Sequence, residues 1–179
     1  YIDTNIKGTF YLLEACKKHG CKRFVFASSP SVYGVNKKVP FAEDDAILQT
    51  ISPYAMTKMA GEQICSNYAQ LSGIRCVCLR FFTVYGPRQR PDLAISKFTR
   101  AIEDGKPIDK YGEGHTKRDY TFINDIVDGI LGALQFNGEP LCYIFNLGGS
   151  QTVHLNAIIS TISTAVDKKE IINQIPDHH

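Results

Sequence analysis

Residues 23–34 read RFVFASSPSVYG, an apolar run that ends in a cluster of serine hydroxyls. The run over 23–27 is rich in aromatic and β-branched residues, which is typical of a strand buried in a parallel sheet. A second such run, RCVCL, spans 75–79, and a helical pattern over 53–71 separates the two, with Ser52 and Pro53 as N-cap and first residue. Because ligands gather beyond the carboxyl ends of parallel strands, we expect the chemistry to begin just after residue 27.

The same alternation continues along the rest of the chain. Apolar periodicity and turn residues predict helices over 3–19, 93–104, 124–136 and 155–165, and strands near 120–123 and 143–147. Strands that alternate with helices form βαβ units. The sequence therefore predicts an α/β fold, a parallel sheet with helices on both faces.

Composition limits the possible functions. A net charge of +2 gives no electrostatic reason to expect nucleic acid or an anionic membrane as a partner. No apolar run approaches the roughly 18 residues of a membrane span. The six cysteines form no C-x-x-C pair, so we assign no metal site and expect reduced thiols in a cytoplasmic protein.

The sharpest local feature is Tyr54-Ala55-Met56-Thr57-Lys58. Positions four apart lie on one helix face, so the Tyr54 hydroxyl and the Lys58 ammonium can converge. A nearby cation lowers a tyrosine pKa from about 10, which suits a general base near neutral pH. The motif alone is weak, because an exposed tyrosine stacked on a lysine stem gives the same spacing.

Its context is more specific. The sequence also contains NIKGT at 5–9, LRFFTVYGPRQ at 79–89, YGEG at 111–114 and RDY at 118–120, in this order. Together these motifs resemble the extended short-chain dehydrogenases/reductases of the NAD-dependent epimerase/dehydratase family, over nearly the whole chain. The resemblance implies part of a Rossmann-like NAD-binding domain at 1–80, which carries the catalytic residues. Residues 81–179 would mix a returning Rossmann strand and helix with part of a small C-terminal substrate-binding domain.

The resemblance also implies roles for individual residues. Ser29, Tyr54 and Lys58 would be catalytic, with Tyr54 as the acid/base on a sugar hydroxyl, Lys58 lowering its pKa and Ser29 holding the reacting oxygen. NAD would contact Ser28, Tyr54 and Lys58. Asn5 matches an asparagine that braces this site, although it could also be an ordinary polar residue at a helix start.

The UDP-sugar substrate would contact a second group of residues. That group comprises Ser29, Ser31, Thr83, Arg88, Arg90, Tyr111 and Arg118. Arg118 matches an arginine that binds the nucleotide diphosphate, and a surface ion pair with Asp119 is the alternative. Tyr111 matches a position near the nucleotide base, where an aromatic side chain could equally cover the core.

Two positions separate the branches of the family. Dehydratases carry Asp-Glu where Pro30 and Ser31 stand here, and UDP-glucuronate decarboxylases carry Glu in place of Ser31. This chain therefore resembles an epimerase, which oxidises a ring carbon transiently to a 4-keto sugar. Thr83, with Arg88 and Arg90 in the same loop, is similar to the pattern of the UDP-glucuronate 4-epimerases. A guanidinium there could pair with a C6 carboxylate, and the alternative is that these arginines are solvated or bind the diphosphate. The alternatives are a UDP-glucose 4-epimerase, or a dehydratase or reductase of the family.

The family's Gly-rich pyrophosphate loop does not occur in these residues. We therefore expect an N-terminally truncated chain that is inactive by itself, and a non-catalytic nucleotide-sugar-binding fragment is the alternative from a different class. Helices 3–19 and 53–71 carry apolar residues on more than one face. The resemblance implies that they pair across a twofold axis in a homodimer.

Overall fold

The computed structural model describes residues 1–47, 49–149 and 151–176. The chain forms two compact units. Unit 1 comprises Tyr1–Phe82 and Asn124–Leu147, and unit 2 comprises Thr83–Ile123 and Gly148–His179. The chain therefore leaves unit 1 after the second strand, builds most of unit 2, and returns to unit 1 for one helix and one strand.

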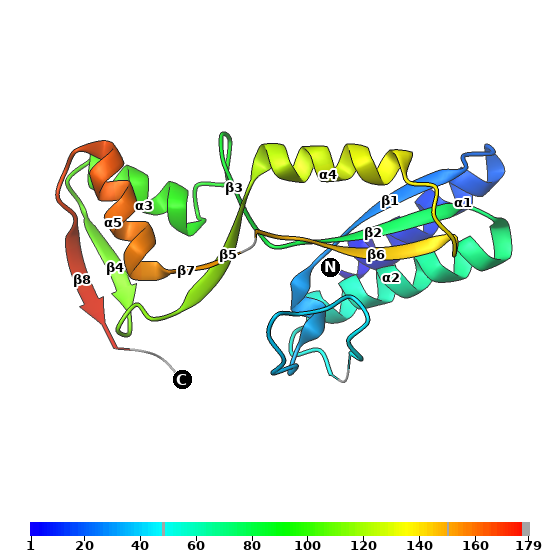
Figure 1. Ribbon diagram of the computed structural model, residues 1–179, viewed down its shortest axis with the longest axis horizontal. Helices are drawn as coiled ribbons and strands as arrows, with labels where there is room; N and C mark the ends of the chain where they lie inside the picture. The colour runs from blue at the N-terminus through cyan, green and yellow to red at the C-terminus, as the bar shows by residue number, and fades with distance from the viewer. Residues whose placement is uncertain (48, 150, 177–179) are drawn as a thin grey trace. The chain divides into compact units, whose positions relative to one another are not determined.

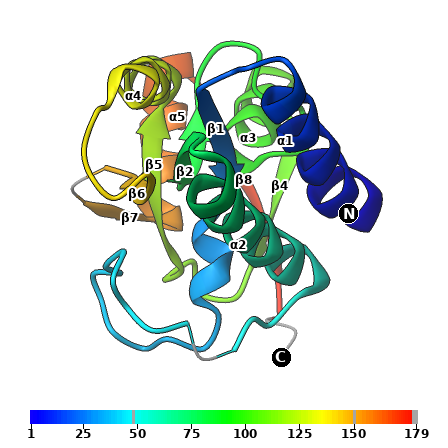
Figure 2. The ribbon, with the colours of Figure 1, turned by 90° about the vertical axis from the view of Figure 1, so that its right-hand side faces the viewer.

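Unit 1 is a three-stranded parallel sheet between two layers of helices. The sheet has the order β1 (Arg23–Ser28), β2 (Arg75–Phe81), β6 (Cys142–Leu147). Figure 1 shows α2 (Pro53–Ser72) along one face of this sheet and α4 (Ile123–Gln135) along the other. α1 (Thr9–Lys18) lies beside α2 (Figure 2). The predicted parallel α/β fold with helices on both faces is confirmed.

Alternation along β2 explains the two layers. Cys76 and Cys78 are buried with Leu13 of α1 and with Cys65 and Ala69 of α2. The intervening Val77 and Leu79 are buried with Ala133 of α4. Successive side chains of a strand point to opposite faces, so a continuous apolar run supplies both layers of the core.

Local signals set the ends of α2. Ser52 Oγ accepts a hydrogen bond from Ala55 N at 3.1 Å, and Pro53 occupies the first turn. At the other end Gly73 adopts the left-handed conformation with φ 65°, and its N–H bonds to Ala69 O at 3.1 Å. The helix predicted over 53–71 is thus confirmed, one residue longer.

The first helix differs in detail from the one predicted over 3–19. Its opening segment, η1 (Ile2–Gly8), is a π-helix, and only α1 is α-helical. A π-helix is wider than an α-helix, rare, and frequent near functional sites. The periodicity of apolar residues indicates a helix, but it does not show in which part the backbone hydrogen bonds join residues five apart rather than four apart.

Unit 2 contains two small sheets and two helices. β5 (Lys117–Phe122) pairs in parallel with β3 (Thr83–Tyr85) and antiparallel with β7 (Thr152–His154). β4 (Pro107–Tyr111) pairs in parallel with β8 (Ile171–Ile175). α3 (Ala94–Glu103) and α5 (Leu155–Val166) enclose an apolar cluster of Phe98, Ile102, Ile108, Ile159 and Ile162.

Four strands of unit 2, namely β3, β4, β7 and β8, were not predicted. They are three to five residues long and carry mixed or exposed side chains. Such strands depend on pairing with distant segments rather than on local alternation. Within the described ranges, no helix has both the length and the apolar character needed to cross a bilayer.

Candidate active site

The end of β1 presents the serine cluster. Ser29 has an extended backbone, with φ −154° and ψ 145°, and is the N-cap of the short helix η2 (Pro30–Tyr33). Its Oγ accepts hydrogen bonds from Ser31 N at 3.2 Å and from Ser31 Oγ at 3.0 Å. The predicted residues Ser29 and Ser31 are therefore joined directly, and both are half-buried.

Tyr54 and Lys58 lie on successive turns at the start of α2. Lys58 Nζ donates a hydrogen bond to Ala27 O at 2.8 Å, so it reaches the carboxyl-terminal part of β1. The same nitrogen lies 5.7 Å from the centroid of the Tyr54 ring and 5.3 Å from that of Phe26. Burial lowers the pKa of Lys58 below its ordinary value. The lysine thus places a half-buried cation between the tyrosine and the end of the strand.

Asn5 braces the first turn of α2 through one intermediate. Asn5 Nδ2 donates to Thr57 Oγ1 at 3.0 Å, and Thr57 Oγ1 donates to Tyr54 O at 2.8 Å. Thr57 is fully buried, and the edge of the Tyr1 ring meets Tyr54 with the ring centroids 5.3 Å apart. The π-helical segment that carries Asn5 is therefore bonded to the turn that carries Tyr54.

Three residues near the site were missed by sequence reasoning: Thr57, Glu62 and Arg80. The buried Ser28 hydroxyl donates to Glu62 Oε1 at 2.5 Å, so its side chain is engaged inside the fold. Two signals were present in the sequence. Glu62 follows Lys58 by one further helical turn, and Arg80 is a charge that continues an otherwise apolar strand.

The other predicted site residues lie in unit 2. Thr83 opens β3 opposite Tyr120 of β5, and Arg88 follows in a loop with a positive φ of 66°. Arg90 is exposed and pairs with Asp92, with Nη2 and Oδ2 3.1 Å apart. Tyr111 ends β4 with 51% of its surface exposed.

Arg118 lies exposed on β5, opposite Val153 of β7. An ion pair with Asp119 was the alternative to a role in anion binding. Among the residues described, no salt bridge involves Arg118. Asp119 Oδ1 instead accepts the backbone N–H of Gly149 at 2.6 Å.

Comparison with known proteins shows the family of the chain. Residues 1–148 match the model of the NAD dependent epimerase/dehydratase family. The chain is 45% identical over 171 residues to an uncharacterized protein of Methanocaldococcus jannaschii, covering 94% of this chain and 51% of that one. It is 44% identical over 177 residues to UDP-glucuronate 4-epimerase 1 of Arabidopsis thaliana, covering 90% of this chain and 41% of that one.

A solved structure is similar over almost the whole chain. The UDP-glucuronic acid 4-epimerase of Bacillus cereus, in complex with UDP-glucuronic acid and NAD, superposes with a TM-score of 0.90 at 36% identity. The match covers 99% of this chain and 56% of that one. The chain spans about half the length of the curated relatives it matches. On its sequence and its fold, the chain belongs to the NAD dependent epimerase/dehydratase family, as its motifs predicted.

Proposed function

We propose that these residues belong to an NAD-dependent 4-epimerase of UDP-sugars, and that its substrate is UDP-glucuronate or UDP-galacturonate. One observation carries the proposal: Lys58 bonds to the end of β1 beside the Ser29 turn, while its ammonium also faces the ring of Tyr54. A phenol, a cation and a hydroxyl are thus assembled at the carboxyl ends of parallel strands, where α/β proteins bind their ligands. The similarity to the Arabidopsis thaliana UDP-glucuronate 4-epimerase 1 and to the Bacillus cereus enzyme supports the same reaction.

Tyr54 acts in this proposal as the general base and acid. Beside the ammonium of Lys58, the Tyr54 oxygen takes the proton from the C4 hydroxyl of the sugar and later returns it. Ser29 Oγ donates to the C4 oxygen, because its present hydrogen bonds are both accepted and leave its proton available. NAD, when bound, would supply the redox chemistry, as the acceptor and then the donor of the C4 hydride.

The residues present fit the nicotinamide end of the cofactor. Lys58 is a half-buried donor with two further protons beyond the one bonded to Ala27 O. We assign it to the nicotinamide ribose, together with Tyr54. Ser28 would contribute through its backbone, since its hydroxyl is bonded to Glu62. These residues contain no Gly-rich loop, so we do not assign them the pyrophosphate.

The residues after Ser29 favour epimerisation over dehydration. Pro30 occupies the first turn of η2, and the Ser31 hydroxyl is bonded to Ser29 Oγ. Water elimination from a sugar needs a second acid to protonate the leaving hydroxyl. Neither position provides a carboxyl group, so a 4-keto sugar formed here would be reduced again rather than dehydrated.

We assign unit 2 to substrate recognition. Its exposed Arg118 would bind the diphosphate, for which a guanidinium is well suited. Arg90 would bind the C6 carboxylate of a uronate and would exchange Asp92 for the substrate. Arg88 has an exposed side chain in the same loop, Thr83 would contact the sugar, and Tyr111 would pack near the base.

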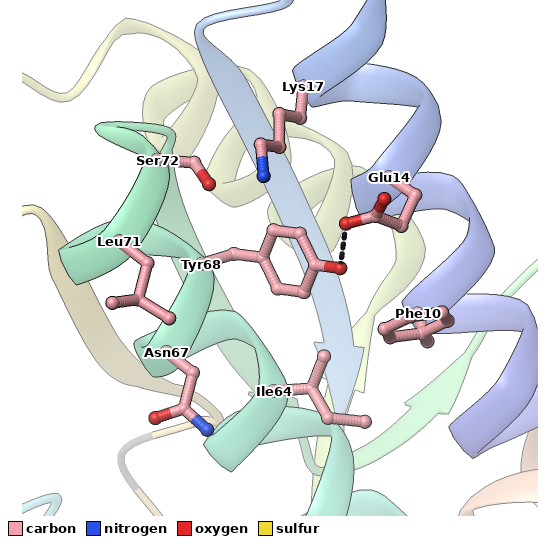
Figure 3. Close-up of a pocket in the computed structure, with 8 residues that line it drawn as sticks. All are labelled: Phe10, Glu14, Lys17, Ile64, Asn67, Tyr68, Leu71 and Ser72. Atoms are coloured by element: carbon pink, nitrogen blue, oxygen red, sulfur yellow. Dashed lines mark hydrogen bonds between the residues drawn. The ribbon is translucent and has the colours of Figure 1, made fainter.

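We also propose a homodimer through α1 and α2. The two helices leave apolar side chains exposed, among them Tyr11 at 66%, Leu12 at 59% and Leu71 at 86%. Between them lies a pocket of about 350 Å³ that includes Phe10, Ile64, Tyr68 and Leu71, with Tyr68 donating to Glu14 across it (Figure 3). Exposed apolar side chains on neighbouring helices are typical of an interface. A second copy would form a four-helix bundle, in a cytoplasmic protein whose six cysteines are all free thiols.

Replacing Tyr54 with Phe in the full-length protein tests the proposal. Conversion of UDP-glucuronate should fall by at least about 10²–10⁴-fold, because general acid–base groups contribute this much. Binding of NAD and UDP, measured by calorimetry, should remain. Tyr143→Phe is the matched control. Tyr143 lies in β6, and its phenol donates a hydrogen bond to Glu139 O. Full activity in Tyr54→Phe would overturn the catalytic assignment, and an inactive wild type that binds both ligands would favour the non-catalytic alternative.

A further inference from the structure

A polar layer crosses the sheet of unit 1 at its carboxyl edge, at the last residue of β1 and the last but one of β2 and β6. Ser28 of β1 is the register partner of Arg80 of β2, and Arg80 is the register partner of Asn146 of β6. The preceding partners, Ala27, Leu79 and Phe145, are all apolar. The change from apolar to polar side chains thus occurs in all three strands at the same level.

Glu62 of α2 joins two members of this layer. Its Oε1 accepts hydrogen bonds from Ser28 Oγ at 2.5 Å and from Arg80 Nε at 2.9 Å. Its Oε2 accepts from Arg80 Nη2 at 2.8 Å. Ser28, Glu62 and Arg80 are only 4%, 3% and 1% exposed, so these bonds form in the interior.

Tyr33 connects Arg80 to the third strand. The Arg80 guanidinium lies 4.6 Å from the centroid of the Tyr33 ring, and Tyr33 OH donates to Asn146 Oδ1 at 2.8 Å. Arg80 Nη1 has no hydrogen-bond acceptor among the residues described. Tyr33 ends η2, so both ends of the segment from Ser28 to Tyr33 are fixed by this network.

Stability alone does not explain such a layer. Removing two charges from water is costly, and replacing a buried ion pair by apolar residues of similar volume is often neutral or stabilising. Within the described part of the chain, one nitrogen of the buried guanidinium also lacks an acceptor. A bidentate carboxylate–guanidinium pair does, however, fix relative positions more strictly than apolar packing does.

The Glu62–Arg80 pair fixes the position of the segment that carries Ser29. Tyr54, Lys58 and Glu62 occupy successive turns of one side of α2, and Glu62 bonds to the residue that precedes Ser29. We propose that Glu62, held by Arg80, is a positioning residue that sets the Ser29 turn of β1 against the side of α2 bearing Tyr54 and Lys58. This inference rests on the proposed epimerase function. A displacement of about 1 Å in such a site can reduce a rate about 10²-fold.

The Ser28 hydroxyl allows a small test. In the full-length protein, Ser28→Ala removes the bond to Glu62 and leaves the Glu62–Arg80 pair intact. We expect kcat for UDP-glucuronate to fall at least about tenfold, with KM, NAD affinity and melting temperature little changed. Ser28→Thr keeps a hydroxyl and should restore most of kcat. Thr99→Ala, which removes a hydroxyl bonded to Ile95 O in α3, is the control and should be silent.

A second variant removes the pair itself. Glu62→Met with Arg80→Met replaces both charged groups by apolar side chains of similar length. It should fold and show the same loss in kcat. Adding Ser28→Ala to it should cause no further loss, because the acceptor for that hydroxyl is already gone. Additive losses would overturn the inference, and so would a Ser28→Ala enzyme with normal kcat. If the paired variant does not fold, the comparison of Ser28→Ala with Ser28→Thr decides.

Crystal structures separate this inference from the proposed function. The distance between Ser29 Oγ and Tyr54 Oη should change in Ser28→Ala and remain in Ser28→Thr. An unchanged distance in Ser28→Ala would overturn the positioning role whatever reaction the protein catalyses. A wild type that converts no UDP-sugar would instead refute the epimerase proposal, while the measured distances would still decide the role of Glu62.

Discussion

Gly61 of α2 lies directly against the ring of Phe26 of β1. A Cβ atom at Gly61 would come within 2.2 Å of Phe26 Cζ and within 3 Å of both Cε atoms. Phe26 is 6% exposed, and Lys58 Nζ lies 5.3 Å from the centroid of the same ring. The absence of a side chain at Gly61 therefore lets α2 approach β1 closely enough for Lys58 to reach Ala27 O.

Gly61→Ala should therefore destabilise the protein, although alanine is the better helix former. The helix preference favours alanine by about 1 kcal/mol, whereas overpacking a buried site costs about 1–3 kcal/mol. With this overlap we expect a net loss of about 1 kcal/mol or more in the free energy of unfolding, measured by urea denaturation. The proposed epimerase activity should fall as well, because Lys58 would move.

Gly132 provides the matched control for this substitution. It lies in α4, and a Cβ atom there would meet nothing within 4 Å. Gly132→Ala should therefore stabilise by about 0.5–1 kcal/mol through helix preference and lower unfolded-state entropy. Phe26→Leu should restore part of the stability that Gly61→Ala loses. A Gly61→Ala protein that is as stable as Gly132→Ala would contradict the close approach of the two elements.

The fold of unit 1 could be predicted because its signals are local. The apolar runs at 23–27 and 75–79 and the cap at Ser52 each specify an element without reference to distant residues. β4 and β8 could not be predicted in this way. β8 reads IINQI, with four of its five residues exposed, and it exists through its pairing with β4, about 60 residues earlier.

The candidate site shows the same division. The spacing of Tyr54 and Lys58, and the serines that follow β1, are visible in the sequence. The bond from Asn5 to Thr57 and the bonds of Glu62 to Ser28 and Arg80 join segments 18 to 52 residues apart. Sequence reasoning about one motif at a time cannot show which polar side chains meet across the core.

Arg90 should determine the proposed preference for a uronate. Arg90→Ala removes a guanidinium whose charge-assisted bond to a carboxylate contributes about 1.5–3 kcal/mol. In the full-length protein, we expect kcat/KM for UDP-glucuronate to fall roughly tenfold to a hundredfold, and that for UDP-glucose to change little. Asp92→Asn is the control, because it releases Arg90 from its partner and should not lower kcat/KM for UDP-glucuronate. Equal losses for both sugars would assign Arg90 to the diphosphate or to folding instead.

Leu71→Asp should convert the proposed dimer to a monomer. Leu71 is 86% exposed and lines the pocket between α1 and α2. In a twofold symmetric dimer both subunits would place this residue in the interface, so the substitution would be buried twice. Burying a leucine contributes about 1.5–3 kcal/mol, and a buried unpaired carboxylate is far more costly. Sedimentation at micromolar concentration measures the result. Val39→Asp introduces the same charge at a residue that is 78% exposed in the loop before α2, and this variant should remain dimeric. A wild type that is already monomeric would refute the interface.

Lys58 should make the stability of the protein depend on pH in a defined direction. Burial lowers its pKa in the folded state, whereas a lysine in the unfolded chain titrates near about 10.4. Between these two values the unfolded chain binds more protons than the folded one. The free energy of unfolding therefore rises with pH in that window. Below the folded-state pKa both states are protonated, and the contribution of Lys58 no longer changes with pH.

Lys58→Met keeps the length of the side chain and removes the titrating group. Thermal unfolding of wild type and variant between neutral pH and about pH 10.4 should show wild type gaining stability relative to Lys58→Met as the pH rises. The exposed Lys97 of α3 provides the control, since the stability of Lys97→Met should depend on pH in the same way as that of wild type. A wild type that loses stability relative to Lys58→Met with rising pH would mean that the hydrogen bond to Ala27 O and the nearby rings favour the charged form more than burial disfavours it.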